Sequence, residues 1–144
     1  MSTDVSQKRA SQETEEMTLL NEAVDLLNAC LDSIPPKSKD PRKFWDHALK
    51  SLQLGSRKGR SFDQMITAMH GALPIGGAFT KKASKKIYVL GEALKSQGRY
   101  HQFRKYVRQN APYIVAYTQH VRDQRKVDTD PTSEWMDYPT TEGD

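Results

Sequence analysis

Apolar side chains recur at helical spacing in six segments of this chain, and glycine or proline lies between most of these segments. In the first segment, the apolar residues from Met17 to Ile34 step along the chain by three and four residues, as one face of a helix requires. Pro35 and Pro36 follow directly and stop the helix. No stretch of useful length alternates apolar and polar residues as a half-buried strand would. The pattern therefore predicts an all-α fold.

Capping residues mark where the predicted helices begin and end. Ser61 with Gln64 fits a capping box, and Thr80 could cap the helix that follows. Asn110 and Pro112 interrupt the last helical stretch, as a break or a kink. The six helices are expected within residues 11–34, 41–55, 61–73, 80–98, 100–110 and 113–125. We expect a compact bundle of five or six short helices around one core.

The length of 144 residues is that of one domain. Residues 1–12 and 127–144 have few apolar residues and no helical stripe, so we expect flexible tails there, the second of them acidic. Residues 13–126 then form the helical domain. Cys30 is the only cysteine, which excludes an internal disulfide, and it lies on an apolar stripe as a small buried side chain would. Because no secretory signal and no membrane-spanning apolar run is visible, the sequence predicts a cytoplasmic location.

Charge is sorted into three blocks along the chain. Residues 1–34 carry seven acidic and two basic residues, a net charge of −5. Residues 35–126 carry twenty basic and five acidic residues, a net charge of +15, and residues 127–144 carry six acidic residues and no basic one. A middle block with so few acids indicates a surface that binds polyanions. The alternative is a solvated surface that serves solubility.

The basic residues of the middle block form three patches, and we expect them to share one exterior face. The first lies in a glycine-containing loop that leads into a helix N-terminus, a position that favours anions, although a solvated turn is the alternative. The second places two pairs of lysines four residues apart, so that like charges stack on one helix face at a cost to the helix. The third holds arginines, whose planar groups grip phosphate with two hydrogen bonds. The predicted nucleic-acid-binding residues are Arg57, Lys58 and Arg60, then Lys81, Lys82, Lys85 and Lys86, then Arg99, Arg104, Lys105 and Arg108.

The acidic block at the C-terminal end interleaves acids with Trp135 and Tyr138. A tryptophan in a loose segment is a typical anchor for a partner, so we interpret these two residues as partner-binding. The segment could also fold back on the basic face of its own chain as a mimic of nucleic acid, or serve only solubility.

Nothing in the sequence indicates an enzyme or a cofactor. The four histidines are scattered and lack the short spacing to cysteine or carboxylates that a metal site needs. The middle block has only five acids, whereas metal-dependent nucleases generally cluster carboxylates. The sequence therefore predicts a protein without catalytic activity, metal or cofactor.

One stretch of the chain is similar to a known family. Residues 90–100 read LGEALKSQGRY, and Phe103-Arg104 and Val107-Arg108 follow. This stretch resembles the helix–turn–helix part of the small subunits of CRISPR effector complexes. Those subunits are compact, basic, all-helical proteins that stack as a filament and contact guide–target or displaced strands without sequence preference. The resemblance implies phosphate contacts for Arg99, Arg104 and Arg108. The family usually continues into further helices where this chain has its acidic C-terminal block, and the acidic first helix is not diagnostic of the family.

Three functions remain open from the sequence. The first is a non-catalytic, largely sequence-independent nucleic-acid-binding subunit of a ribonucleoprotein assembly. Its partners would be RNA, single-stranded or in a guide–target duplex, and other subunits or copies of itself. The second is a viral or phage structural or adaptor protein whose basic face binds an acidic protein or a membrane surface. The third is a small enzyme that acts on nucleic acid.

Overall fold

The computed structural model describes residues 2–129 of the chain and the side chains of residues 13–125. Within residues 2–129 the structure has five α-helices, one short 3₁₀ turn and no strand. The elements are α1 (Ser2–Asp32), η1 (Pro36–Ser38), α2 (Phe44–Gly55), α3 (Phe62–Ala72), α4 (Lys81–Ser96) and α5 (Tyr100–Thr129). The predicted all-α bundle is confirmed. Two of the helices are long, however, and not short as expected.

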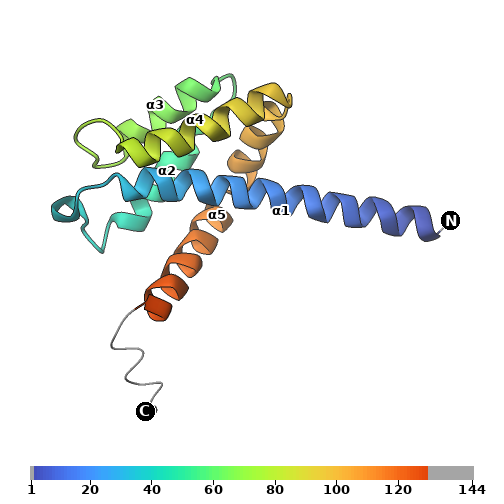
Figure 1. Cartoon of the computed structure of the whole chain (residues 1–144), viewed down its shortest axis with the longest axis horizontal. Coiled ribbons are helices and arrows are strands. Elements are labelled where there is room, and N and C mark those ends of the chain that lie inside the picture. Colours follow the sequence, from blue (N-terminus) through green and yellow to red (C-terminus); the bar gives the residue numbers. More distant parts are fainter. Residues whose placement is uncertain (1, 130–144) are drawn as a thin grey trace, which may run out of the picture.

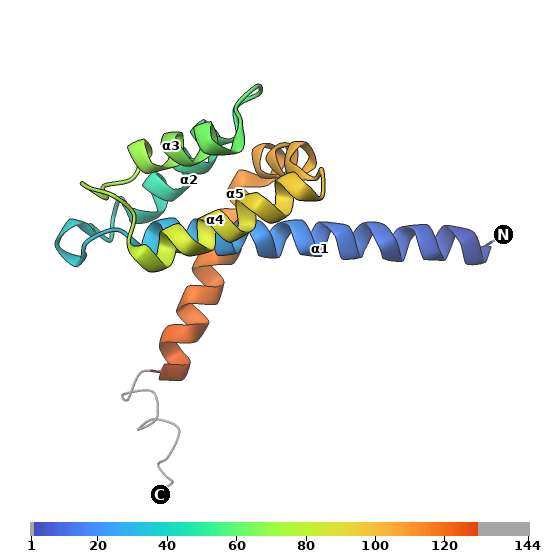
Figure 2. The same ribbon diagram turned by 45° about the horizontal axis from the view of Figure 1, so that its top comes forward.

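Helix α1 is longer than the sequence predicts. Residues 2–12, expected to be a tail, are helical, and in both views this part of α1 extends away from the other helices (Figures 1 and 2). Residues 2–34 contain neither proline nor glycine, so nothing in the backbone chemistry stops the helix at Ser11 or Thr14. Met17, expected to begin the apolar stripe, is 54% exposed, and burial begins at Leu19.

Helix α5 unites the two last predicted helices. Asn110 has non-helical backbone angles (φ −125°, ψ 19°), and Pro112 follows it inside the same element. Proline lacks the N–H that a continuing helix needs, so the predicted interruption is present as a kink. The side-chain amide of Asn110 donates a hydrogen bond to the carbonyl oxygen of Tyr106 at 2.9 Å, which satisfies an acceptor at the kink. The helix continues to Thr129, past the residue 127 at which the acidic tail was expected.

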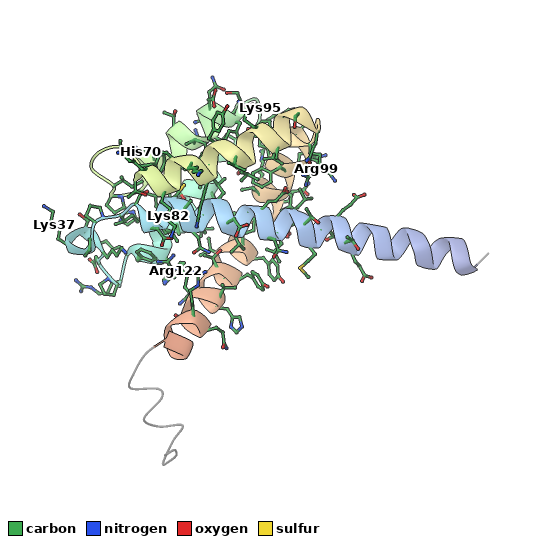
Figure 3. The ribbon with its side chains drawn as sticks, in the orientation of Figure 1. Lys37, His70, Lys82, Lys95, Arg99 and Arg122 are labelled. Carbon is green, nitrogen blue, oxygen red and sulfur yellow. The ribbon has the colours of Figure 1, made fainter. Side chains whose placement is uncertain are left out.

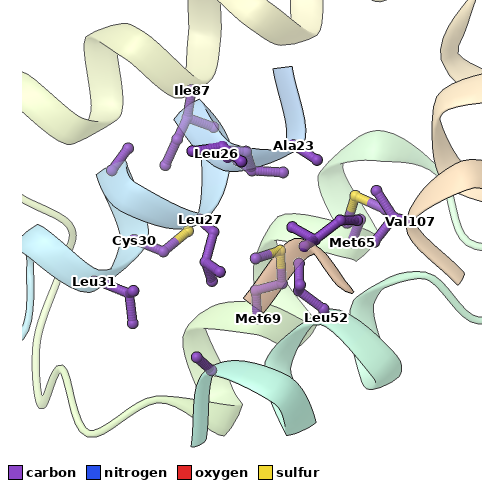
Figure 4. Packing of buried hydrophobic residues seen from close by; sticks show 14 of the residues in the cluster. Ala23, Leu26, Leu27, Cys30, Leu31, Leu52, Met65, Met69, Ile87 and Val107 are labelled. Atoms are coloured by element: carbon purple, nitrogen blue, oxygen red, sulfur yellow. The ribbon is translucent and has the colours of Figure 1, made fainter. Parts of the chain in front are cut away.

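The core lies on both sides of the second half of α1. Leu26 lies beside Ile87 of α4, whereas Leu27 points toward Leu52 of α2 and Met69 of α3 (Figure 4). The first half of α5 adds further fully buried side chains to the same cluster, including Phe103, Val107 and Ile114. Helix α1 therefore holds α4 on one side and the α2–α3 pair on the other.

Local capping works at two of the helix starts as the sequence predicts. The backbone N–H of Gln64 donates to the hydroxyl of Ser61 at 3.1 Å, and the backbone N–H of Ser61 donates to the side chain of Gln64 at 2.8 Å. Thr80 caps α4 by accepting a hydrogen bond from the N–H of Ala83 at 3.1 Å. These caps fix the entry of the chain into α3 and α4.

Gly91 is the point at which α4 lies closest to the Phe62 ring, and a side chain there is expected to destabilise the fold. A Cβ at Gly91 would lie 2.5 Å from Cε2 of Phe62, whose side chain is buried and contacts the ring of Tyr100 edge to face. We expect Gly91→Ala to lower the free energy of unfolding by about 1–3 kcal/mol, measured by urea denaturation. Gly71→Ala is the matched control in α3, because nothing lies within 4 Å of the added Cβ. Equal stability of the two variants would contradict this packing.

The thiol of Cys30 is expected to be unreactive in the folded protein. Cys30 is fully buried, and burial raises the pKa of its thiol from 9.0 to about 12. The thiolate is the reactive form, so at pH 9 a small thiol-specific disulfide reagent should label the protein only in denaturant. Rapid labelling of the native protein at that pH would show that the second half of α1 is not packed as described.

Candidate polyanion-binding groove

Two hydrogen bonds hold the loop between α2 and α3 against the start of α5. The Tyr100 hydroxyl donates to the carbonyl oxygen of Arg60 at 2.7 Å. Nη1 of Arg104 donates to the carbonyl oxygen of Ser56 at 3.0 Å. Both acceptors belong to the loop, and both donors belong to the first turns of α5. The structure thus brings together the first and the third of the predicted basic patches, which lie about 40 residues apart in the chain.

A groove of about 540 Å³ lies where this loop meets α5. Its lining consists of Lys58, His101, Arg104, Lys105, Arg108 and Gln109. Lys58, Lys105 and Arg108 are exposed, and within the described residues none of the three forms an ion pair. No carboxylate of the described part of the chain lines the groove. Four positive side chains without a compensating acid make this groove the candidate site for an anion.

Arg104 forms the buried wall of the groove. Only 5% of its surface is exposed, and among the described residues it has no carboxylate within ion-pairing distance. Among the described residues, its hydrogen-bond partner is the neutral carbonyl of Ser56. Removing a charge from water without an opposite charge costs several kcal/mol. A bound anion would reduce this cost.

A second guanidinium group, that of Arg60, lies near Tyr100. Nε of Arg60 is buried and has no hydrogen-bond partner among the described residues. Burial raises the pKa of Tyr100, and the positive charges of Arg104 and Arg60 oppose that rise. Tyr100 therefore lies close to both groups, and the positive field extends from the groove toward the loop.

Arg99 is occupied by acidic and polar side chains of its own chain. Its guanidinium donates to both carboxylate oxygens of Glu22, at 3.0 and 2.7 Å, and to Gln97 at 3.0 Å. The hydrogen bond to Glu22 is the main reason that the pKa of Arg99 is raised. Nearby, Nε2 of Gln102 donates to Glu15 at 3.4 Å. Arg99 thus fastens α1 to the joint between α4 and α5 (Figure 3), and its charge is compensated.

The second predicted patch lies elsewhere. Lys81, Lys82, Lys85 and Lys86 are exposed on the first two turns of α4 (Lys82 is labelled in Figure 3). The groove lies near the other end of α4, and the 16 residues of this helix span roughly 24 Å. The structure divides the predicted cations into the groove and a separate lysine cluster, and the expectation of one shared basic face stays a prediction. Arg57 is exposed on the loop beside the groove, and Trp135 and Tyr138 lie outside the described residues.

A second hollow, which no sequence pattern predicts, lies near the C-terminal end of α5. Its volume is about 510 Å³, and Phe44, Trp45 and Arg122 are among its lining residues. The guanidinium carbon of Arg122 lies 5.8 Å from the centre of the Phe44 ring, and its Nη1 lies 3.0 Å from Asp32. No local signal could have paired positions almost 80 residues apart in the chain. Because Asp32 compensates Arg122, this hollow fits an anion less well than the groove does.

The described part of the chain offers neither a metal site nor a membrane span. Its histidine, cysteine and acidic side chains nowhere gather in threes in a way that could hold a metal ion. None of its helices combines the length and the apolar character that crossing a bilayer requires.

Residues 90–108, which resemble the small subunits of CRISPR effector complexes, form the end of α4, a turn at Gly98 (φ 65°) and the start of α5. Of the three arginines that the resemblance assigns to phosphate, Arg99 is paired with Glu22, Arg104 is buried in the groove wall and Arg108 is exposed. The resemblance itself stays a prediction. Comparison of the chain with protein-family models, with curated proteins and with solved structures found no match.

Proposed function

We propose that this protein is a non-catalytic nucleic-acid-binding subunit of a ribonucleoprotein assembly and that the groove holds phosphates of the nucleic-acid backbone. The observation that supports this function best is the set of four cations that line the groove without a carboxylate from the described residues. Phosphate contacts fix the position of a strand without reading its bases, so binding would be largely independent of sequence. The proposed ligand is RNA, as a single strand or in a guide–target duplex. The family resemblance would make the assembly a CRISPR effector complex.

The side chains of the groove would contact a phosphate in different ways. Arg108 is exposed and can donate two parallel hydrogen bonds to one phosphate. Lys58 and Lys105 lie on different elements and would approach the strand as mobile point charges from the loop and from α5. Arg104 is fixed by its bond to Ser56, so little conformational entropy is lost when an anion binds.

A binding assay at increasing salt tests the proposal. The full chain is titrated with single- and double-stranded RNA and DNA of mixed sequence. If about four phosphates are neutralised, affinity should fall roughly 50-fold for a single strand and roughly 150-fold for a duplex between about 50 and 200 mM salt, because released counterions drive binding. Sequence should matter little. Equal affinity at the two salt concentrations would reject the proposal. Binding to anionic vesicles or to an acidic protein, but to no nucleic acid, would favour the adaptor alternative.

A further inference from the structure

The lysine cluster of α4 borders a second groove, which has a volume of about 550 Å³. One wall is α4, with Lys85, Lys86, Val89, Leu90 and Ala93. The facing wall consists of Asp25, Asn28 and Asp32 of α1 and Arg125 of α5. We call this hollow the α4 groove. It combines cations with apolar surface, which an acidic peptide with large apolar side chains would match.

Apolar surface is exposed at the α4 groove to an unusual degree. Val89 is 59% exposed and lies on a helix with few other exposed large apolar side chains. Tyr88 is 67% exposed but lines a different hollow, beside Phe62. Val89 lines the groove directly. An apolar patch rimmed by charged residues is typical of a surface that a peptide or protein covers.

The four lysines in the first two turns of α4 also lack an acidic partner among the described residues. Within the described residues, Lys81, Lys82, Lys85 and Lys86 form no ion pair. Each of the pairs Lys81–Lys85 and Lys82–Lys86 places like charges on one helix face, near the helix end where the macrodipole disfavours cations. An acidic partner would offset both the repulsion between the lysines and their unfavourable interaction with the helix dipole.

The chain itself continues from the edge of this groove. Arg125 lies in the groove wall, and the described part of α5 ends one turn later at Thr129. Residues 130–144 follow, with five acidic residues, no basic residue and the apolar side chains of Trp135, Met136 and Tyr138. The six residues from Thr129 to Trp135 can span up to roughly 20 Å. Length, charge and apolar content therefore suit this segment to the groove.

We propose that residues 130–144 dock in the α4 groove of the same chain, with Trp135 against Val89 and the acids beside Lys85 and Lys86. Of the two carboxylates in the facing wall, Asp32 is paired with Arg122 at 3.0 Å. Of the wall carboxylates, Asp25 is then left to compensate the charges of Lys85 and Lys86. The excess positive charge of the groove favours an acidic segment. The proposal does not rest on nucleic-acid binding, because it uses the other end of α4. A docked segment would shield the lysine cluster from other polyanions.

Fluorescence of Trp135 tests this docking in the full chain. Trp45→Phe leaves Trp135 as the only tryptophan and keeps an aromatic ring beside Phe44. In that background we expect the emission of Trp135 to be blue-shifted relative to exposed tryptophan and its acrylamide quenching constant to be small. Adding Lys85→Glu and Lys86→Glu should shift the emission toward that of exposed tryptophan and raise the quenching constant severalfold. The matched control is Lys37→Glu with Lys50→Glu, two exposed lysines outside the α4 groove with the same change in charge.

Each outcome decides the proposal. Trp135 that is already exposed before the lysines are changed, or an equal effect of the control pair, would overturn it. Protection that grows with protein concentration would assign the groove to a second copy and overturn docking within one chain. Circular dichroism and a urea midpoint show whether the reversed lysines keep the fold. If they do not, Lys85→Gln with Lys86→Gln removes the charges without reversing them and should still raise quenching.

Discussion

Reversing three charges of the polyanion-binding groove, with Lys58→Glu, Lys105→Glu and Arg108→Glu, is expected to weaken nucleic-acid binding by roughly 100-fold or more near 100 mM salt. All three side chains are exposed and have no ion pair among the described residues, so their positive charge is available to a ligand. Loss of three phosphate contacts should also reduce the slope of log affinity against log salt by roughly two to three. Both quantities come from one salt-titrated binding assay.

A control with the same total charge separates the groove from net charge. Lys37, Lys43 and Lys50 are exposed and lie outside the groove, on η1, before α2 and on α2. Their reversal to glutamate changes the net charge of the chain by the same amount as reversal of the groove residues. We expect this control to bind with much less loss. If both triple variants lose affinity equally, the groove has no special role and the overall charge carries the binding.

Phe103→Ala is expected to lower the free energy of unfolding by about 3–5 kcal/mol. Phe103 is fully buried and is the largest side chain in the core with so little exposure. Removing its ring leaves a cavity that the surrounding helices can fill only in part, which adds to the lost burial of apolar surface. Because Arg104 is the next residue of α5, the same change should also disturb the groove wall. Urea denaturation followed by circular dichroism measures the loss.

Met17→Ala provides the comparison for this loss. Met17 belongs to α1 but is 54% exposed, and alanine is a good helix former. We expect the free energy of unfolding of the Met17→Ala variant to stay within about 0.5 kcal/mol of that of the unchanged protein. A similar loss for Phe103→Ala and Met17→Ala would contradict the division between the buried and the projecting parts of the molecule.

Sequence reasoning predicted what depends on neighbouring residues. The capping box of Ser61 and Gln64, the cap at Thr80 and the interruption at Pro112 are all determined within a few positions of the chain. The predicted start of α1 was wrong, because the prediction relied on an apolar stripe that begins near Met17. A stripe marks the part of a helix that is buried, whereas the helix itself continues wherever no residue disfavours it.

The roles of the arginines depend on contacts that the sequence cannot display. Glu22 and Arg99 lie 77 positions apart, and Ser56 and Arg104 lie 48 positions apart. Nothing near Arg104 in the chain indicates that a loop will cover it, whereas its neighbour Lys105 stays exposed on another side of α5. Packing of whole helices therefore decides which cations a ligand can reach.

The contact of α1 with the start of α5 sets a boundary beside the groove. Glu15 accepts a hydrogen bond from Gln102, and Glu16 is one of the causes, after burial and Tyr113, that raise the pKa of Tyr106. Two carboxylates of α1, those of Glu15 and Glu16, thus lie near the first half of α5, the helix that also carries Lys105 and Arg108. Like charges repel, so these carboxylates would keep a phosphate chain away from that side of α5. The acidic residues of α1 would then determine the direction in which a bound strand leaves the protein.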